Sequence, residues 1–229
     1  MNLRFVPVFV VLLTMLVSKS NAQLSRLAAG GGLNYTNYLG YYSAGNTGIN
    51  LRVTYDVFAK GTASVGFLYG FPMKTTDFAT ANSTNSSNTR STIEVPVEDV
   101  MAFKTFYGNF NYFFLKENTS PFGMYATLGA GLTIASYEST YGTYDKINYS
   151  IPGSSETSGS EMGFIIQGGA GAQAKFGPAV VFLEGQFGLP ASTVNGSEVE
   201  NYIPFSVCTN LGLKFHFGSD KSSKGKKKK

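Results

Sequence analysis

Apolar and polar residues alternate along most of the chain with the two-residue period of β-strands. In residues 126–137, ATLGAGLTIASY, alanine, leucine or isoleucine stands at each even position up to Ile134, and threonine or glycine stands at most odd ones. Successive side chains of a strand point to opposite faces, so one face here is apolar and the other is small and mildly polar. The two faces must therefore meet different surroundings.

The same alternation predicts eight strands and no helix. The strands fall at about 24–35, 47–58, 62–73, 99–115, 122–137, 161–175, 179–189 and 201–217. Most are longer than the roughly five or six residues of strands in soluble proteins. They match the roughly 9 to 11 residues that a tilted strand needs to cross a bilayer.

Short and long connections alternate between these strands. The connections are tight at 59–61, 116–121 and 176–178, and longer at 36–46, 74–98, 139–160 and 190–200. Short turns at one end and long loops at the other are typical of bacterial membrane barrels. We expect the two longest loops, which are polar and rich in serine and threonine, to be mobile and to lie outside the cell.

The residues of the polar face indicate which face points outward. They are mainly Gly, Ser, Thr, Asn and Gln, whereas a face exposed to water carries many lysines and glutamates. This face therefore predicts a packed interior, and the apolar face, with Lys104 as its one clear charge, predicts contact with lipid. Because strand edges cannot remain open in hydrocarbon, the sheet is expected to close.

We therefore predict an all-β fold, an eight-stranded antiparallel up-and-down transmembrane β-barrel over residues 23–217. A soluble β-barrel with the inverse arrangement is the alternative fold. The apolar residues Leu68, Phe103, Phe113, Ile165, Val180 and Phe182 fall on the polar face and do not fit the pattern. Aromatic residues near strand ends are expected to form girdles at the lipid boundaries, namely Tyr35, Tyr38, Tyr41, Tyr69, Phe71, Phe122 and Tyr137.

Composition and the chain ends indicate an exported protein. Charged residues make up 14% of the chain, against roughly 25% in soluble domains, and Cys208 is the single cysteine. Residues 1–22 predict a signal peptide, with Arg4, an apolar core and small residues before Gln23. No apolar run after it approaches the roughly 20 residues of a spanning helix.

The basic charge lies mostly outside the predicted barrel. Residues 218–229 hold six of the 18 lysines and arginines, and residues 23–217 hold ten against 13 acidic residues, a net charge of −3. The excess of lysine therefore does not predict nucleic-acid binding. We expect a disordered periplasmic tail, which is either solvated or in contact with anionic lipid or peptidoglycan.

The chain resembles the eight-stranded outer-membrane barrels of the OmpA/OmpX type from Gram-negative bacteria. The resemblance covers residues 23–217 and includes the last strand, LGLKFHF, which is similar to the aromatic-ended signal that such barrels present to the barrel-assembly machinery. It implies a place in the outer membrane of the cell envelope, in contact with its lipid. It also implies that Leu211, Leu213, Phe215 and Phe217 act as an assembly signal.

The predicted interior contains several charged side chains. An eight-stranded barrel is just wide enough to be filled by side chains, so no open channel is expected. Arg52 and Glu184 should lie near mid-height, and a further set should lie toward the periplasmic end: Arg26, Asp56, Lys175, Lys214 and His216. Unpaired charges there would be costly, so we expect pairing, either as a stabilising plug or as a gated pathway.

The sequence predicts no catalytic, metal or cofactor site. His216 is the only histidine and is expected to point inward at the periplasmic end, away from the outer leaflet where lipid A-modifying barrels need a base. The acidic residues of the loops are too scattered for a calcium site. We therefore expect a non-enzymatic protein with a structural role or an adhesive role through loops whose ligand the sequence does not identify. A narrow porin-like or hydrophobic-solute channel and a lipid A-modifying enzyme are the alternatives.

Overall fold

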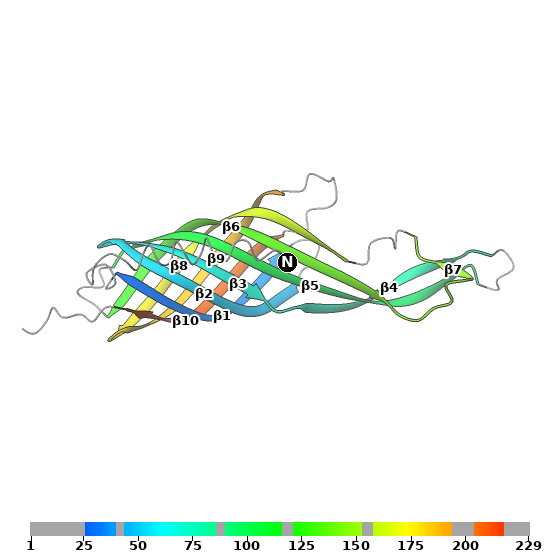
Figure 1. Cartoon of the computed structure of the whole chain (residues 1–229), viewed down its shortest axis with the longest axis horizontal. Helices are drawn as coiled ribbons and strands as arrows, with labels where there is room; N and C mark the ends of the chain where they lie inside the picture. Colours follow the sequence, from blue (N-terminus) through cyan, green and yellow to red (C-terminus); the bar gives the residue numbers. More distant parts are fainter. Residues whose placement is uncertain are drawn as a thin grey trace, which may run out of the picture.

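The chain forms an antiparallel β-barrel with a β-sheet projecting from one end (Figure 1). The computed structural model describes residues 26–39, 44–85, 90–115, 121–152, 158–193 and 204–217. These residues form no helix long and apolar enough to cross a membrane. Their strands are β1 Leu27–Leu39, β2 Ala44–Phe58, β3 Gly61–Gly70, β4 Met73–Ser83, β5 Thr92–Phe113, β6 Phe122–Tyr141, β7 Tyr149–Ser150, β8 Ser158–Phe176, β9 Ala179–Thr193 and β10 Phe205–His216.

Eight of these strands close the barrel. The order around the wall is β1, β2, β3, β5, β6, β8, β9 and β10, each antiparallel to the next. The wall closes where β10 pairs with β1, from Ala28↔His216 to Leu39↔Phe205. The predicted all-β, eight-stranded antiparallel fold is confirmed, and so is the resemblance to eight-stranded outer-membrane barrels at the level of the fold.

The two ends of the barrel differ in their connections. Residues 59–60 join β2 to β3 and residues 177–178 join β8 to β9, and Gly177 has a φ of 63°, a left-handed conformation that favours glycine. Both termini of the wall lie at this same end, because the Phe217 N–H donates to the Leu27 carbonyl over 3.0 Å. We call it the turn end and the opposite end the loop end.

Exposure alternates along the strands as an inside-out pattern. Leu128, Val65 and Phe106 are 66%, 54% and 53% exposed on the outer face of the wall. Asn50 and Glu184, which point inward, are each 1% exposed. The predicted inversion, with apolar residues outside and polar residues inside, is therefore present.

The apolar residues that did not fit the alternation pack inside the barrel. Leu68, Phe103, Phe113, Ile165, Val180 and Phe182 are all buried. At the loop end, the Phe103 ring stacks on Tyr38, with ring centroids 4.1 Å apart, and Met101 and Ala135 pack beside it. An aromatic layer thus fills the interior near the loop end.

The girdle prediction is wrong at two positions. Tyr38 is buried inside the barrel, and Tyr137 packs against the same interior cluster as Phe103. Both residues lie on the inward face of their strands, and this face determines the location of the side chain even near a strand end. Tyr35, Phe71 and Phe122 are exposed on the wall, and Tyr41 lies outside the described residues.

The prediction that residues 74–98 form a mobile loop is also wrong for residues 74–83 and 92–98, which are strands. β4 pairs with the first half of β5 from Met73↔Met101 to Asn82↔Thr92, and β6 continues as far as Tyr141. Together with β7 these segments form a sheet beyond the loop end of the wall, which we call the outer extension (Figure 1).

The outer extension has a small apolar core of its own. Ala81, Val95 and Ile151 are buried there, and residues packed around them include Ala79, Ile93, Tyr141, Tyr144 and Tyr149. Pro96 lies within β5, and its carbonyl accepts the Gly142 N–H over 2.7 Å on the side away from β4. The Pro96 nitrogen faces the same side, so the absence of an N–H there interrupts no hydrogen bond to β4. The extension is therefore an ordered element.

Two predicted segments lie outside the described residues. They are the signal peptide, residues 1–22, and the lysine-rich tail, residues 218–229. Both stay predictions from the sequence.

Candidate functional site

An ion pair crosses the barrel interior. Arg52 on β2 and Glu184 on β9 are 5% and 1% exposed, and their side chains meet in a two-point contact. Arg52 Nη2 donates to Glu184 Oε1 over 3.0 Å, and Nη1 donates to Oε2 over 3.2 Å. The guanidinium carbon also lies 4.2 Å from the centroid of the Phe182 ring. This planar double contact is the geometry that arginine suits best.

Each oxygen of the Glu184 carboxylate has a second donor. The Tyr125 hydroxyl donates to Oε2 over 2.9 Å, and Gln186 Nε2 donates to Oε1 over 2.9 Å. A buried ion pair offsets the cost of leaving water only when further hydrogen bonds complete it. The four donors meet that condition for Glu184, whereas Arg52 Nε is buried and has no hydrogen-bond partner among the described residues.

A second polar layer lies next to the ion pair on the loop-end side. The Tyr107 hydroxyl donates to Asn50 Oδ1 over 2.7 Å, and Asn50 Nδ2 donates to Asn210 Oδ1 over 2.9 Å. The Cys208 thiol donates to the same Asn210 oxygen over 3.6 Å. These contacts join β5, β2 and β10 through side chains, so the interior links strands that are not neighbours in the wall.

The other predicted interior charges lie nearer the turn end. Arg26 is exposed, Lys214 is buried, and Asp56, Lys175 and His216 are half-buried. The Thr62 hydroxyl donates to Asp56 Oδ1 over 3.1 Å. The structure thus pairs Arg52 with Glu184. Lys214 lies close to this pair along the wall, because Lys214 on β10 and Arg52 on β2 both lie opposite Gly30 of β1.

The four residues of the proposed assembly signal point away from the interior. Leu211, Leu213, Phe215 and Phe217 are all exposed on the outer surface of the wall. The first three lie on β10, and Phe217 follows it. Their role in assembly stays a prediction.

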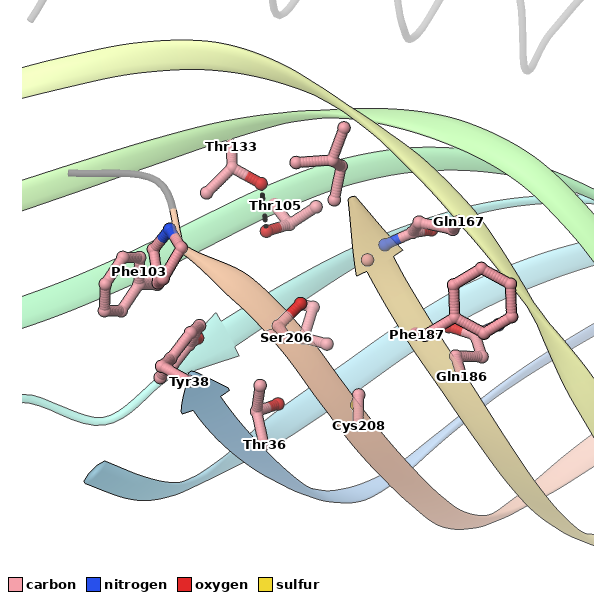
Figure 2. A pocket seen from close by; sticks show the side chains of 14 residues that line it. Thr36, Tyr38, Phe103, Thr105, Thr133, Gln167, Gln186, Phe187, Ser206 and Cys208 are labelled. Atoms are coloured by element: carbon pink, nitrogen blue, oxygen red, sulfur yellow. Dashed lines mark hydrogen bonds between the residues drawn. The ribbon is translucent and has the colours of Figure 1, made fainter. Parts of the chain in front are cut away.

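A small cavity lies between Cys208 of the polar layer and the Tyr38–Phe103 stack (Figure 2). Gln186, which donates to Glu184 of the ion pair, also lines it. The cavity volume is about 30 Å³, and its lining combines hydroxyl, amide and thiol groups with apolar side chains. Thr105 and Thr133 are joined across one wall by a hydrogen bond of 2.9 Å. A space of this size holds a few water molecules and is far below the roughly 300 Å³ of a typical ligand pocket.

Sequence reasoning identified the charged pair and missed its neutral partners. Tyr125, Gln186 and Tyr107 all have inward parity, which the alternation does show. Which inward residues meet across the barrel depends on strand tilt and register, and neither is visible in a single strand. The height of each residue along the barrel axis would have identified these contacts, and the sequence does not give that height.

The outer extension has polar contacts of its own. Lys74 on β4 pairs with Glu98 on β5, and this contact raises the pKa of the lysine. In the turn before β7, Asp145 accepts hydrogen bonds from the Asn148 side chain and from the Ile147 and Asn148 backbone N–H groups. These bonds lower the pKa of Asp145, because they favour its charged form.

Comparison with known proteins shows similarity to solved outer-membrane structures. The barrel is similar to Neisserial surface protein A, with a TM-score of 0.49 and 11% identity over 84% of this chain and 97% of that one. It is similar to OprG from Pseudomonas aeruginosa, with a TM-score of 0.47 and 12% identity over 84% and 96% of the two chains. It is also similar to Ail, the attachment invasion locus protein of Yersinia pestis, with a TM-score of 0.43 and 14% identity over 82% and 95%.

These three similarities concern the fold. No protein-family model matches the chain, and no curated protein sequence matches it.

Proposed function

We propose that the chain is an integral protein of a bacterial outer membrane, with a filled barrel that anchors an external β-sheet. The observation that carries this proposal is the apolar outer wall around a polar interior, shown by Leu128 at 66% exposure and Glu184 at 1%. Such an outer face is stable in hydrocarbon and would be an aggregation hazard in water. Closure of the wall through β1 and β10 supports the same location, because it leaves no open edge in lipid.

Within this proposal the interior is a stabilising plug and performs no chemistry. The completed hydrogen bonds around Glu184 support a structural role. The position of His216 near the turn end supports a non-enzymatic protein, since a lipid A-modifying base would need to face the outer leaflet. Binding is assigned to the outer extension, which lies beyond the wall.

Membrane fractionation tests the location. The protein should fractionate with outer membranes and migrate faster on detergent gels before boiling than after, because a closed barrel resists the detergent until it is heated. Recovery in the soluble fraction would contradict the proposal, as would one mobility for boiled and unboiled samples.

A narrow channel is the second candidate function, favoured by the polar cavity on the loop-end side of the ion pair. The ion pair and the Tyr38–Phe103 stack both lie across the path that a solute would take.

For the tail, we propose contact with peptidoglycan or anionic lipid, supported by its lysines and by the position of Phe217 at the turn end. Outer-membrane lipid and the barrel-assembly machinery complete the proposed partners.

A further inference from the structure

One edge of β4 lies outside the barrel and faces away from β5. β4 pairs with β5 along its whole length, from Met73↔Met101 to Asn82↔Thr92. In the part of the chain that the structure describes, its other edge pairs only with β7, at Asn82 and Ser83. A strand edge with available N–H and C=O groups is a template for another strand.

The backbone groups of alternate residues point to the two edges of β4. The Ser83 N–H donates to the Ser91 carbonyl on the β5 side over 2.8 Å, and the Thr84 N–H donates to the Asn148 carbonyl on the β7 side over 2.9 Å. Because this direction alternates along a strand, even-numbered residues of β4 present their backbone groups to the outer edge. Lys74, Thr76, Phe78 and Thr80 are the residues concerned.

One of these groups is covered by a side chain. The Phe78 N–H donates to Oδ1 of the preceding Asp77 over 2.8 Å. The Phe78 ring is itself 63% exposed. The Asp77 carboxylate therefore disfavours pairing of other strands with the middle of this edge, as charged residues on edge strands do. A strand that pairs there must displace this carboxylate from the Phe78 N–H.

We propose that this edge pairs with the same edge of a second copy of the chain, held in a facing membrane. The two β4 strands run antiparallel and are centred on Phe78, so that the two Phe78 rings lie side by side. In this register Thr76 faces Thr80 and Asp77 faces Ala79, so no like charges stand directly opposite each other. Aromatic and threonine pairs of this kind stabilise antiparallel strands. A register centred on Asp77 would place two carboxylates opposite each other and is disfavoured.

The direction of β4 explains why the copies belong to facing membranes. β4 extends beyond the loop end along the long axis of the barrel (Figure 1). Copies in one membrane all point the same way, whereas copies in two facing membranes point toward each other and meet antiparallel. A single edge contact is weak, but many copies on each surface act together. This inference rests on the proposed membrane location.

Vesicle tethering tests the inference. The protein is reconstituted into phosphatidylcholine vesicles, and tethering is followed by turbidity, with flotation in a density gradient as a separate measure of insertion. We expect wild-type vesicles to tether to one another and not to protein-free vesicles. Thr76→Pro should abolish tethering, because it removes an N–H from the outer edge and none from the ladder with β5. Thr76→Val, which keeps the N–H, is the matched control and should tether like wild type. Asp77→Ala should increase tethering, because it uncovers the Phe78 N–H.

The outcomes separate this inference from the proposed function. Failure to float with the vesicles would contradict the membrane location. Flotation without tethering would overturn the pairing of copies, and so would tethering to protein-free vesicles. Tethering by Thr76→Pro equal to that of wild type, with the heat-dependent gel shift intact in both, would also overturn it.

Discussion

At the scale of single residues, the barrel interior depends on whether each buried polar group has a partner. Glu184 is a charged side chain at 1% exposure, and four donors from Arg52, Tyr125 and Gln186 surround it. Removing one member of such a set leaves the others without compensation, which costs more than the intact set contributes. Loss of one partner should therefore lower the free energy of unfolding by more than the intact pair contributes to it.

Glu184→Gln should reduce the free energy of unfolding by about 3–5 kcal/mol, because it leaves the Arg52 charge buried without a counter-charge. Urea unfolding in lipid vesicles measures this change. The double variant Arg52→Met with Glu184→Leu should recover much of the loss, because it removes both charges. Glu98→Gln, which breaks the exposed pair with Lys74, is the control and should change little. A single variant as stable as wild type would contradict the plug.

A charge on the outer wall should be costly in proportion to its depth in the membrane. Leu128 lies in the middle of the wall segment of β6 and is 66% exposed, so Leu128→Arg should cost about 2–4 kcal/mol of unfolding free energy. Phe176→Arg, at the turn end of β8, should cost less than about 1 kcal/mol beyond the loss of the ring. Leu128→Ala controls for lost side-chain contact. Equal costs at the two depths would argue against a bilayer around the wall.

Inward and outward parity could be predicted from the sequence at most positions. The alternation placed Asn50, Arg52 and Glu184 inside and Phe106 and Leu128 outside, as the structure shows. It did not distinguish an inward aromatic from an interfacial one, and so it misplaced Tyr38 and Tyr137. Period two gives the face of a side chain, but whether an inward aromatic finds room depends on residues across the barrel.

At the scale of elements, the outer extension shows why the strands β4 and β7, the start of β5 and the end of β6 were missed. Residues 74–98 are polar on average, and this average hid the alternation of Ile93, Val95 and Val97 in the second half of the segment. Pro96 lies within this alternation, and prolines are uncommon inside strands, but its nitrogen faces away from β4. Whether a strand can contain a proline depends on which edge of the strand the proline nitrogen faces, and the sequence does not show this direction.

Val95→Asp should open the outer extension and leave the barrel closed. Val95 is 1% exposed in the small core with Ala81 and Ile151, so a carboxylate there would be buried without a partner. Limited proteolysis of vesicle-inserted protein should then cleave within residues 73–101, while the heat-dependent gel shift persists. Thr80→Asp, on an exposed position of β4, should remain resistant. Loss of the gel shift in Val95→Asp would show that the two parts fold as one unit.

The turn before β7 should loosen at low pH. The pKa of Asp145 is lowered in the folded chain by bonds from Asn148 and Ile147. A depressed pKa means that the contribution to stability is complete above the unfolded pKa of about 3.9 and is lost as pH falls through the folded value. NMR titration of the Ile147 and Asn148 amide shifts in micelles should therefore give a midpoint below this unfolded pKa of about 3.9. A midpoint at or above it would show that these bonds are absent in solution.

At the scale of the whole molecule, the filled interior predicts a protein that does not conduct ions as an open pore does. The ion pair, the second polar layer and the Tyr38–Phe103 stack follow one another along the axis. Planar bilayers containing the protein should show no steady single-channel steps. Reproducible steps that scale with salt concentration would favour the narrow-channel alternative. A detergent-only bilayer is the control.

The overall architecture could be predicted because it follows from a repeated pattern. Eight alternating segments and the separation of short from long connections together specify the closed wall. Partners and ligands do not follow from such a pattern, since the alternation describes contact with lipid and filling of the interior. The extension, where binding is proposed, is the part that deviates from it.

Closure of the wall by β1 and β10 has a consequence for biosynthesis. The strand made first is completed only by the strand made last, so a growing chain has no partly finished form whose edges could rest in lipid. The chain must stay outside the bilayer until its final segment exists, and a premature stop anywhere before residue 205 yields a product that cannot take its place in the membrane.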